Sequence, residues 1–322
     1  MASTSCAGDD VIVDNPVRDR NFANSSEYIA VFGDIQYYTN STYINLFQQS
    51  LDWILSASDS LNIVSVLHTG DITQSNNINK EWRYFKEAMT GFSDKIPFIS
   101  MIGDHDYTWE LDEKRNTNSF INDRYSTHFN EYISFPNVTS RIEAAFEADR
   151  MENIVVHNVV QGERLDFLLL EFGPRKEVVE WANQWVSSHP DIKYVLMNHE
   201  YLEKGGGRRT SGLKCQARLN NTTYTTPEEL WEQLVKPNDN ILGVLCGHVG
   251  GLYALTLDEN DFGRKVPQIQ HNIQSAEYRY DNWLMLWEFP ADSDSVNVSI
   301  YNTQTRRFFE DKPVLIRFGY RN

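Results

Sequence analysis

Short apolar runs alternate with amphipathic stretches along the first third of the chain. Residues 28–32, 63–68 and 97–102 form apolar runs with the length and β-branched content of buried strands. Between these runs, residues 43–56 and 81–89 place apolar side chains at helical spacing. This alternation is typical of βαβ units, which build a parallel sheet.

The later elements are predicted from the same patterns and from one capping box. The capping box, Thr226-Pro227-Glu228-Glu229, begins a helix that runs to residue 235. Further strands are predicted at residues 154–160, 165–171, 194–197, 241–246, 283–289 and 296–301, and a further helix at 177–188. The last strands suit an antiparallel completion of the sheet. We therefore expect an α/β fold, a four-layer α/β/β/α sandwich of two mixed sheets flanked by helices.

The domain organisation is expected to be simple. Residues 1–26 are polar and without pattern, so we expect a flexible tail there, followed by a single domain at 27–322. Cys6 lies in a segment that resembles the cleavage site of a bacterial lipoprotein, which would place the protein at the cell envelope. In the alternative, Cys6 is an incidental residue of the tail and the protein is cytoplasmic. No apolar run is long enough to span a bilayer.

The net charge of the chain restricts the kinds of partner that it can bind. With 45 acidic and 29 basic residues the formal net charge is −16, which repels nucleic acid, so we expect no nucleic-acid partner. A phosphorylated small molecule would be repelled too, unless bound cations reverse the local field. The three cysteines are too few and too scattered for a disulfide framework or a thiolate metal site. Nothing in the sequence indicates an oligomeric state.

Acidic, amide and imidazole side chains directly follow five of the predicted strands. These residues are Asp34, Gln36, Asp71, Asp104, His105, Asp106, His199 and His248. A single Asp after a Gly is a common turn residue, but packing does not require the whole set. Loops at the carboxyl ends of strands are where α/β proteins place ligand groups. Carboxylates and imidazoles are ligands for ions such as Mn, Fe or Zn, so the set indicates a metal site.

The ordered set resembles the signature of the calcineurin-like metallophosphoesterase superfamily. That signature is Asp-X-His, Gly-Asp, Gly-Asn-His-(Asp/Glu), a lone His and Gly-His-X-His, and the resemblance spans Asp34 to Gly250. The segments Leu170-Glu171-Phe172-Gly173-Pro174-Arg175 and Asn198-His199-Glu200-Tyr201-Leu202 resemble a bacterial branch of this superfamily, in which Gln replaces the first His.

The resemblance implies two adjacent metals, bridged by Asp71 and a hydroxide that attacks phosphorus in line. One metal would be held by Asp71, Asp104, His199 and His248, and the other by Asp34, Gln36 and Asp71. His105 would donate a proton to the leaving oxygen, with Asp106 orienting its ring. The alternative for His105 is a buried histidine that serves packing.

Three positions depart from the signature. Gln36 is a poorer ligand for transition metals than a histidine, and Gly250 offers no side chain where the last His would stand. Asp104 replaces an Asn and adds a negative charge beside its metal. We therefore expect one tightly bound transition ion such as Mn, Fe or Zn, and a second, weaker site for Mn, Mg or Ca.

Four further residues have less certain assignments. Arg208 and Arg209 could clamp a phosphate bidentately, although a solvated loop also explains them. His68 lies within a strand and fits the core or a supporting position better than a metal ligand. His271 could reach into the site and replace the ligand missing at Gly250.

The function that these features favour is a metal-dependent phosphoesterase with a phosphorylated small molecule as substrate. Hydrolysis of a monoester and of a diester both remain open, and the sequence does not identify the substrate. A second hypothesis is a degenerate family member with an impaired metal site that binds a phosphorylated ligand or partner without turnover. A third is a scaffold without a site, which would bind no metal.

Overall fold

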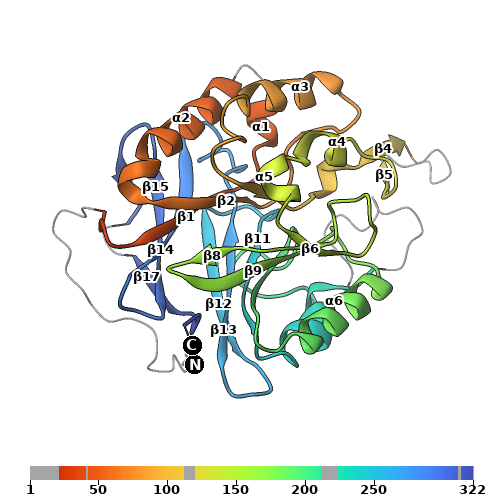
Figure 1. The fold of residues 1–322 in the computed structure, drawn as a ribbon. Helices are drawn as coiled ribbons and strands as arrows, with labels where there is room; N and C mark the ends of the chain where they lie inside the picture. Colours follow the sequence, from red (N-terminus) through yellow and green to blue (C-terminus); the bar gives the residue numbers. More distant parts are fainter. Residues whose placement is uncertain (1–21, 41–42, 112–119, 212–223, 311–312, 322) are drawn as a thin grey trace, which may run out of the picture.

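A computed structural model describes residues 22–40, 43–111, 120–211, 224–310 and 313–321. Two mixed sheets lie at its centre and helices flank them (Figure 1). This is the sandwich that the sequence predicts. None of the described helices is both long and apolar enough to cross a membrane.

The first sheet combines three parallel strands from the start of the chain with antiparallel strands from its end. Its order is β16 (Arg307–Phe308), β15 (Ser295–Asn302), β14 (Trp283–Phe289), β1 (Glu27–Phe32), β2 (Ile63–His68) and β3 (Phe98–Ser100), and β17 (Val314–Arg317) also pairs with β15. Strands β1, β2 and β3 run parallel, whereas β14 is antiparallel to both β1 and β15. The carboxyl ends of β1, β2 and β3 therefore meet at one edge of the sheet.

The second sheet is also mixed. Its order is β12 (Tyr253–Glu259), β13 (Lys265–His271), β11 (Ile241–Cys246), β10 (Lys193–Asn198), β9 (Glu163–Leu170), β7 (Ile154–Val156) and β6 (Ile142–Ala145), and β8 (Val159–Val160) pairs with β9. The parallel strands β9, β10, β11 and β13 form its centre. A separate hairpin consists of β4 (Thr108–Leu111) and β5 (Phe120–Asp123).

Helices α2 (Ile44–Leu61) and α3 (Asn79–Ala88) lie over the first sheet and α6 (Lys176–Ser188) over the second (Figure 1). The shorter helices are α1 (Gln36–Thr39), α4 (Phe129–Ile133), α5 (Pro136–Thr139) and α7 (Pro227–Leu230). Phe47 of α2 and Phe85 of α3 pack against Phe98 of β3, which fixes these helices on the first sheet. Val178 and Ala182 of α6 belong to a second core cluster with residues of β9, β10 and β11.

The main core fills the space between the sheets. Leu67 of the first sheet and Val195 and Leu245 of the second belong to one buried cluster, and all three are fully buried. Apolar faces of two sheets must be covered to be stable in water, and here each covers the other. The packed sheets hold the carboxyl ends of their parallel strands rigidly, which is what a precise site requires.

The predicted elements are confirmed with small shifts of their ends. All three early strands, both early helices and the strands at 194–197, 241–246, 283–289 and 296–301 are present. The predicted strands at 154–160 and 165–171 correspond to β7, β8 and β9, in which β7 and β8 pair antiparallel with β9. The capping box also forms, because Thr226 and Glu229 exchange side-chain to backbone hydrogen bonds. The helix that follows differs, since it widens into a π-helical turn over Trp231–Val235.

Residues 22–26 differ from the flexible tail that the sequence analysis predicts for residues 1–26. Residues 22–26 pack on the domain, because Phe22 makes edge contacts with Tyr28 and Tyr301, with ring centroids 5.9 and 5.4 Å apart. Ser26 is buried and donates a hydrogen bond to Glu288 at 2.9 Å. A single aromatic residue in a polar segment shows no periodicity, which is why the pattern missed it. Cys6 lies outside the described residues.

Candidate metal centre

Four of the predicted ligands meet where the parallel strands end. Asp71 follows β2, Asp104 follows β3, and His199 and His248 follow β10 and β11. Each offers one ligand atom, and these atoms all lie within 4.8 Å of one another. All four side chains are buried. The structure therefore brings together the complete set that the sequence analysis assigned to one metal.

Close backbone approach explains the glycines that precede Asp71, Asp104 and His248. A Cβ atom at Gly103 would lie 2.1 Å from Asp71 Oδ1, and one at Gly247 would lie 2.3 Å from Asp34 Oδ1. No side chain fits at such distances, so the loops can meet only where glycine stands. The repeated pattern of strand, glycine and ligand is thus a requirement of the geometry.

Two of the ligands have strained backbones. Asp71 has φ +58° and His248 has φ +63°, in the left-handed region that residues with a Cβ seldom adopt. Residues held in such conformations cost free energy and persist only where the surrounding structure fixes them. Here the strain turns both side chains toward the cluster, which supports a role in ligand binding.

The hydrogen bonds of His199 leave one ring nitrogen directed at the carboxylates. Its Nδ1 lies 2.6 Å from the carbonyl oxygen of Thr69, and because a carbonyl only accepts, Nδ1 carries the proton. Its Nε2 is buried without a hydrogen bond and lies 3.4 Å from both Asp71 Oδ1 and Asp104 Oδ1. A neutral imidazole whose other nitrogen is held by a carbonyl is the usual state of a metal-bound histidine. The donor set therefore fits a metal ion.

His248 contacts Asp104, one of the two carboxylates near His199. Its Nδ1 lies 3.1 Å from Asp104 Oδ1, and its Nε2 lies 3.6 Å from Glu200 Oε2. Glu200 is 3% exposed, and its other oxygen lies 3.6 Å from Arg209 Nε. Arg209 and Glu200 therefore support His248 from behind, a role for Glu200 that the sequence did not indicate.

Charge and burial oppose each other in the cluster. Burial raises the pKa of Asp104, but the nearby His105 and His248 outweigh it, so the pKa lies well below its ordinary value. Burial lowers the pKa of His199, but Asp71 and Asp104 outweigh it and raise the pKa well above its ordinary value. The site thus favours a positive charge between two carboxylates, and a divalent cation meets that demand.

Asp34 and Gln36 lie beside the cluster with other partners. Asp34 accepts hydrogen bonds from Thr69 Oγ1 at 2.9 Å, the amides of Asn272 and Gln274 at 2.8 and 2.9 Å, and the backbone N–H of His248 at 3.0 Å. Burial, the largest effect, raises the pKa of Asp34 to about 6. Asn272 and Gln274 follow β13 and have no counterpart in the signature that the sequence analysis used.

Gln36 contacts Asp71, the carboxylate that would bridge two metals if the family resemblance holds at this site. Its Nε2 donates to Asp71 Oδ2 at 3.0 Å, while its Oε1 is buried without a hydrogen bond. At Gly250, the nearest atom to an added Cβ would be Ser275 Cβ, at 4.0 Å.

His105 lies at the rim of the cluster, half-buried where the four ligands are buried. Its backbone N–H donates to Asp71 Oδ1 at 3.0 Å, and its Nδ1 donates to the carbonyl oxygen of Gln74 at 2.7 Å. Asp106 does not orient this ring, which corrects the sequence analysis. Asp106 accepts from the backbone N–H groups of Thr73 and Gly103, each at 3.0 Å. The segment Asp104–Asp106 is a 3-10 turn, in which neighbouring side chains diverge by about 120°.

The loop arginines are held by carboxylates of the protein. Arg208 pairs with Asp258 and with Glu228 at 2.9 Å, and its guanidinium lies 4.6 Å from the ring centre of Trp231. Arg209 pairs with Glu203 at 2.7 Å. A guanidinium whose donors are used in this way is a poor phosphate clamp, so the structure does not support that prediction.

His68 and His271, the two further candidate histidines, are buried and have hydrogen-bond partners outside the cluster. His68 lies 2.8 Å from Ser100 Oγ through Nδ1, and His271 donates to the carbonyl oxygen of Leu252 at 2.8 Å. Burial lowers the pKa of His68 to about 3 and that of His271 to about 4, so both are neutral near pH 7. His271 is not among the gathered ligands, and the prediction that it replaces the missing histidine is not supported.

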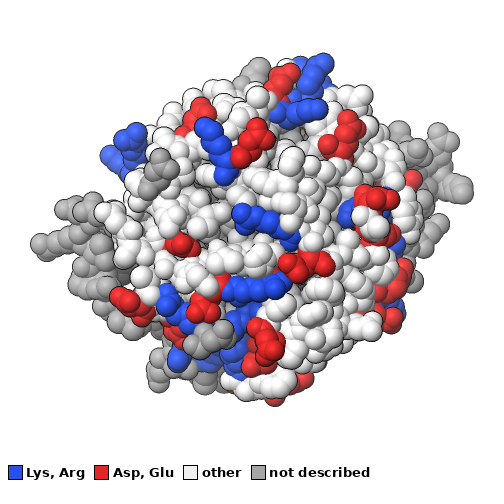
Figure 2. All heavy atoms as spheres, in the orientation of Figure 1, with Lys and Arg blue, Asp and Glu red and all other residues white. Residues whose placement is uncertain are grey.

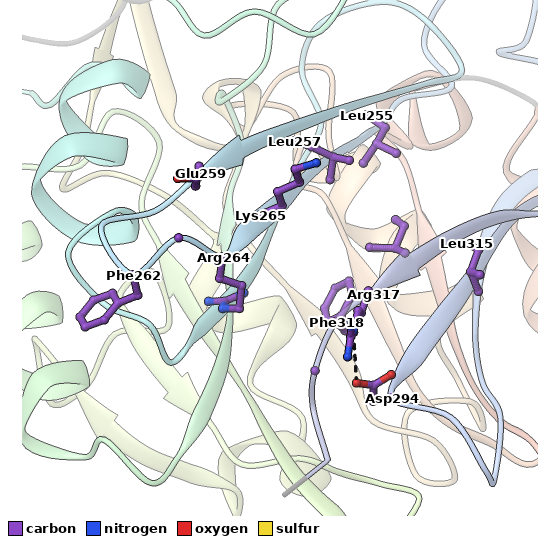
Figure 3. A pocket seen from close by; sticks show the side chains of 13 residues that line it. Leu255, Leu257, Glu259, Phe262, Arg264, Lys265, Asp294, Leu315, Arg317 and Phe318 are labelled. Carbon is purple, nitrogen blue, oxygen red and sulfur yellow. Dashed lines mark ion pairs between the residues drawn. The ribbon is translucent and has the colours of Figure 1, made fainter. Parts of the chain in front are cut away.

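Two surface features lie apart from the centre. Figure 2 shows acidic and basic side chains interspersed on the face in view. Figure 3 shows a cavity of about 530 Å³ between the β12–β13 hairpin and β17, lined by Leu257, Leu315 and Phe318 and by an ion pair of Arg317 with Asp294. None of the candidate site residues lines this cavity.

Comparison with a family and a curated relative adds to this picture. The family model described as calcineurin-like phosphoesterase matches residues 28–254. A protein from Bacillus subtilis with the name "Uncharacterized protein YvnB" is 27% identical over 278 residues, which cover 84% of this chain and 19% of that protein. This chain thus spans about a fifth of the length of that relative.

Solved structures share the fold at low sequence identity. Purple acid phosphatase PPD1 from yellow lupin superimposes with a TM-score of 0.53 and 13% identity, over 92% of this chain and 55% of that one. GAP50, described as the anchor in the inner membrane complex of Plasmodium, superimposes with a TM-score of 0.50 and 10% identity, over 92% of this chain and 90% of that one. At these identities the likeness shows the fold alone.

Proposed function

The chain belongs to the calcineurin-like phosphoesterase family, and we propose that it is a metal-dependent enzyme that hydrolyses a phosphomonoester or phosphodiester of a small molecule. One observation carries this proposal. The ligand atoms of Asp71, Asp104, His199 and His248 lie within 4.8 Å of one another, in a buried cluster. A set of two carboxylates and two imidazoles without thiolates suits a catalytic ion better than a structural one.

The four residues of the cluster would hold the metal. Two imidazole nitrogens favour a transition ion such as Mn, Fe or Zn over Mg or Ca. When bound, such an ion supplies a Lewis acid for the phosphoryl oxygens and lowers the pKa of a water molecule. The backbone carbonyl of Thr69 and the carboxylate of Glu200 orient the rings of His199 and His248, which keeps the ligand atoms in place.

His105 is the residue that handles the proton of the leaving group. The Gln74 carbonyl fixes the proton on Nδ1, so Nε2 is the nitrogen that exchanges a proton with substrate. The hydrogen bond from its backbone to Asp71 ties His105 to the cluster. Its half-buried position lets a substrate reach the ring.

Arg279 is the cation best placed to bind the phosphate. Its guanidinium lies 4.0 Å from the ring centre of Tyr37, the residue after Gln36, and its Nε is buried without a hydrogen bond. The turn that carries Arg279 begins at Ser275, whose Cβ lies 4.0 Å from the place that a Cβ at Gly250 would take. Among the described residues no carboxylate pairs with Arg279, in contrast to Arg208. An arginine stacked on an aromatic ring keeps its donors in a fixed plane for an oxyanion.

A panel of phosphomonoesters, phosphodiesters and pyrophosphates tests this function, with Mn, Zn, Fe, Mg and Ca added separately. We expect hydrolysis of at least one ester class with a transition ion, and its loss in the Asp104→Ala variant. If the metal-loaded protein hydrolyses no member of the panel, the proposed activity is wrong.

A second function has one specific observation in its favour. Gly250 and Gln36 replace two imidazoles of the signature, as in a degenerate family member that binds a phosphorylated ligand or partner without turnover. GAP50 has the same fold and is described as an anchor. Metal binding together with saturable binding of a phosphate ester, but without hydrolysis, would favour this alternative. A chain that binds no metal would point instead to a scaffold.

A further inference from the structure

We infer that this chain holds a single metal ion, because side-chain amides close the position that the second metal takes in the family. The inference concerns the site of the proposed function and rests on that function for the first metal. Three amide side chains carry it, from Gln36, Asn272 and Gln274. They donate hydrogen bonds to the two carboxylates that a second metal would need.

Asp34 is the first of these carboxylates, and one of its oxygens is fully used. Asp34 Oδ2 accepts from the amides of Asn272 and Gln274 and from the backbone N–H of His248, more than its two lone-pair sites, and Oδ1 accepts from Thr69 Oγ1. A buried anion is costly unless hydrogen bonds or a cation compensate it. Here the amides and the hydroxyl offset part of that cost without an ion.

The orientation of Asn272 is fixed by a second hydrogen bond. Its Oδ1 accepts from the backbone N–H of Gln274 at 2.7 Å, so its Nδ2 must be the atom that faces Asp34. The same contact holds Gln274 next to Asp34, where its Nε2 donates at 2.9 Å. The residues after β13 thus form a small clamp on Asp34.

Asp71 is the second of these carboxylates, the one that would bridge two metals, and the side-chain amide of Gln36 contacts it. Gln36 Nε2 donates to Asp71 Oδ2 at 3.0 Å, while Asp71 Oδ1 lies toward His199 and accepts from the backbone N–H of His105. The two oxygens of Asp71 therefore have different partners. Oδ1 faces the four-residue cluster, and Oδ2 accepts a hydrogen bond from the Gln36 amide.

Gly250 lacks the side chain that would supply a further ligand to the second metal. In the signature a histidine stands here and supplies an imidazole, whereas a Cβ at Gly250 would meet only Ser275. The second position would therefore have no nitrogen ligand of its own. Gln36 and Gly250 stand where the signature has histidines, so both imidazoles of the second metal position are lost. The four-residue cluster of the first metal position is intact.

Manganese titration with elemental analysis and electron paramagnetic resonance tests this inference without any assay of turnover. We expect this chain, stripped of metal and titrated with Mn²⁺, to saturate at one tightly bound ion with the spectrum of an isolated Mn²⁺. The variant Gln36→His/Gly250→His/Gln274→Ala restores both imidazoles and removes one amide. It should bind a second ion and show the spectrum of an exchange-coupled pair.

The control is Gln304→Ala, which removes an exposed amide far along the chain and should stay at one ion. Two tightly bound, coupled ions in the unmodified protein would overturn the inference, since the glutamine oxygens would then be ligands. A folded triple variant that still binds only one ion would also contradict it. A protein that binds one ion but hydrolyses no ester would instead refute the proposed function and leave this inference standing.

Discussion

Replacing His105 with alanine should separate proton transfer from metal binding. His105 is not one of the four residues whose ligand atoms gather, and it touches the cluster through its backbone N–H, which alanine retains. The variant should therefore keep its metal content. The truncation removes the hydrogen bond from Nδ1 to the Gln74 carbonyl, and the half-buried site leaves room for water to replace it.

The expected loss is that of a positioned general acid. Such groups contribute about 10²- to 10⁴-fold in rate, which corresponds to roughly 3 to 5 kcal/mol of transition-state stabilisation. The loss should depend on the leaving group, because a good leaving group such as p-nitrophenolate needs no proton. Turnover of an alkyl phosphate should fall by ~10²-fold or more, while turnover of the p-nitrophenyl ester should fall far less.

The assay compares both substrates in His105→Ala, in wild-type protein and in His189→Ala, a histidine at the end of α6 that lies outside the site. Metal content is measured on the same samples by elemental analysis. An equal loss for both leaving groups would refute proton donation by His105. A loss of metal as large as that in Asp71→Ala would show that His105 supports the metal rather than the leaving group.

Substitutions at four further residues test the rest of the site. Asp71→Ala should strip the metal, because Asp71 is a ligand that lies 3.4 Å from His199 Nε2, and elemental analysis measures the loss. Glu200→Gln should weaken metal affinity by about 10- to 100-fold through His248, and unchanged affinity in a chelator competition would contradict the support that we assign to Glu200. Arg279→Ala should raise KM for a phosphate ester about tenfold or more, whereas Arg279→Lys should restore part of the binding. Arg208→Ala should lower the melting temperature and leave KM unchanged, and the reverse pattern for the two arginines would restore Arg208 as the phosphate clamp.

The candidate ligands of the first metal could be predicted from sequence because each follows a predicted strand. A glycine precedes Asp71, Asp104 and His248, and the structure shows why the glycine at 103 or 247 cannot be replaced. Sequence order also identifies which strand ends meet, since the parallel strands of each sheet end at the same edge.

The remaining parts of the site carry no such signal. Asn272 and Gln274 follow a strand as ordinary polar residues, and only the fold shows that they reach Asp34. Asp106 was misassigned because adjacency in sequence suggested contact, whereas a 3-10 turn directs neighbouring side chains apart. Arg208 was misread because its carboxylate partners lie 20 and 50 residues away in the chain.

The most direct test of the account is a metal titration of activity. Protein stripped with a chelator is assayed on a phosphate ester that the panel identifies, while Mn²⁺ is added in substoichiometric steps. The account predicts that hydrolysis is lost on stripping, returns in proportion to added metal and levels off at one ion per chain. Hydrolysis that persists unchanged after the metal is removed, or that never appears at any metal content, would contradict it.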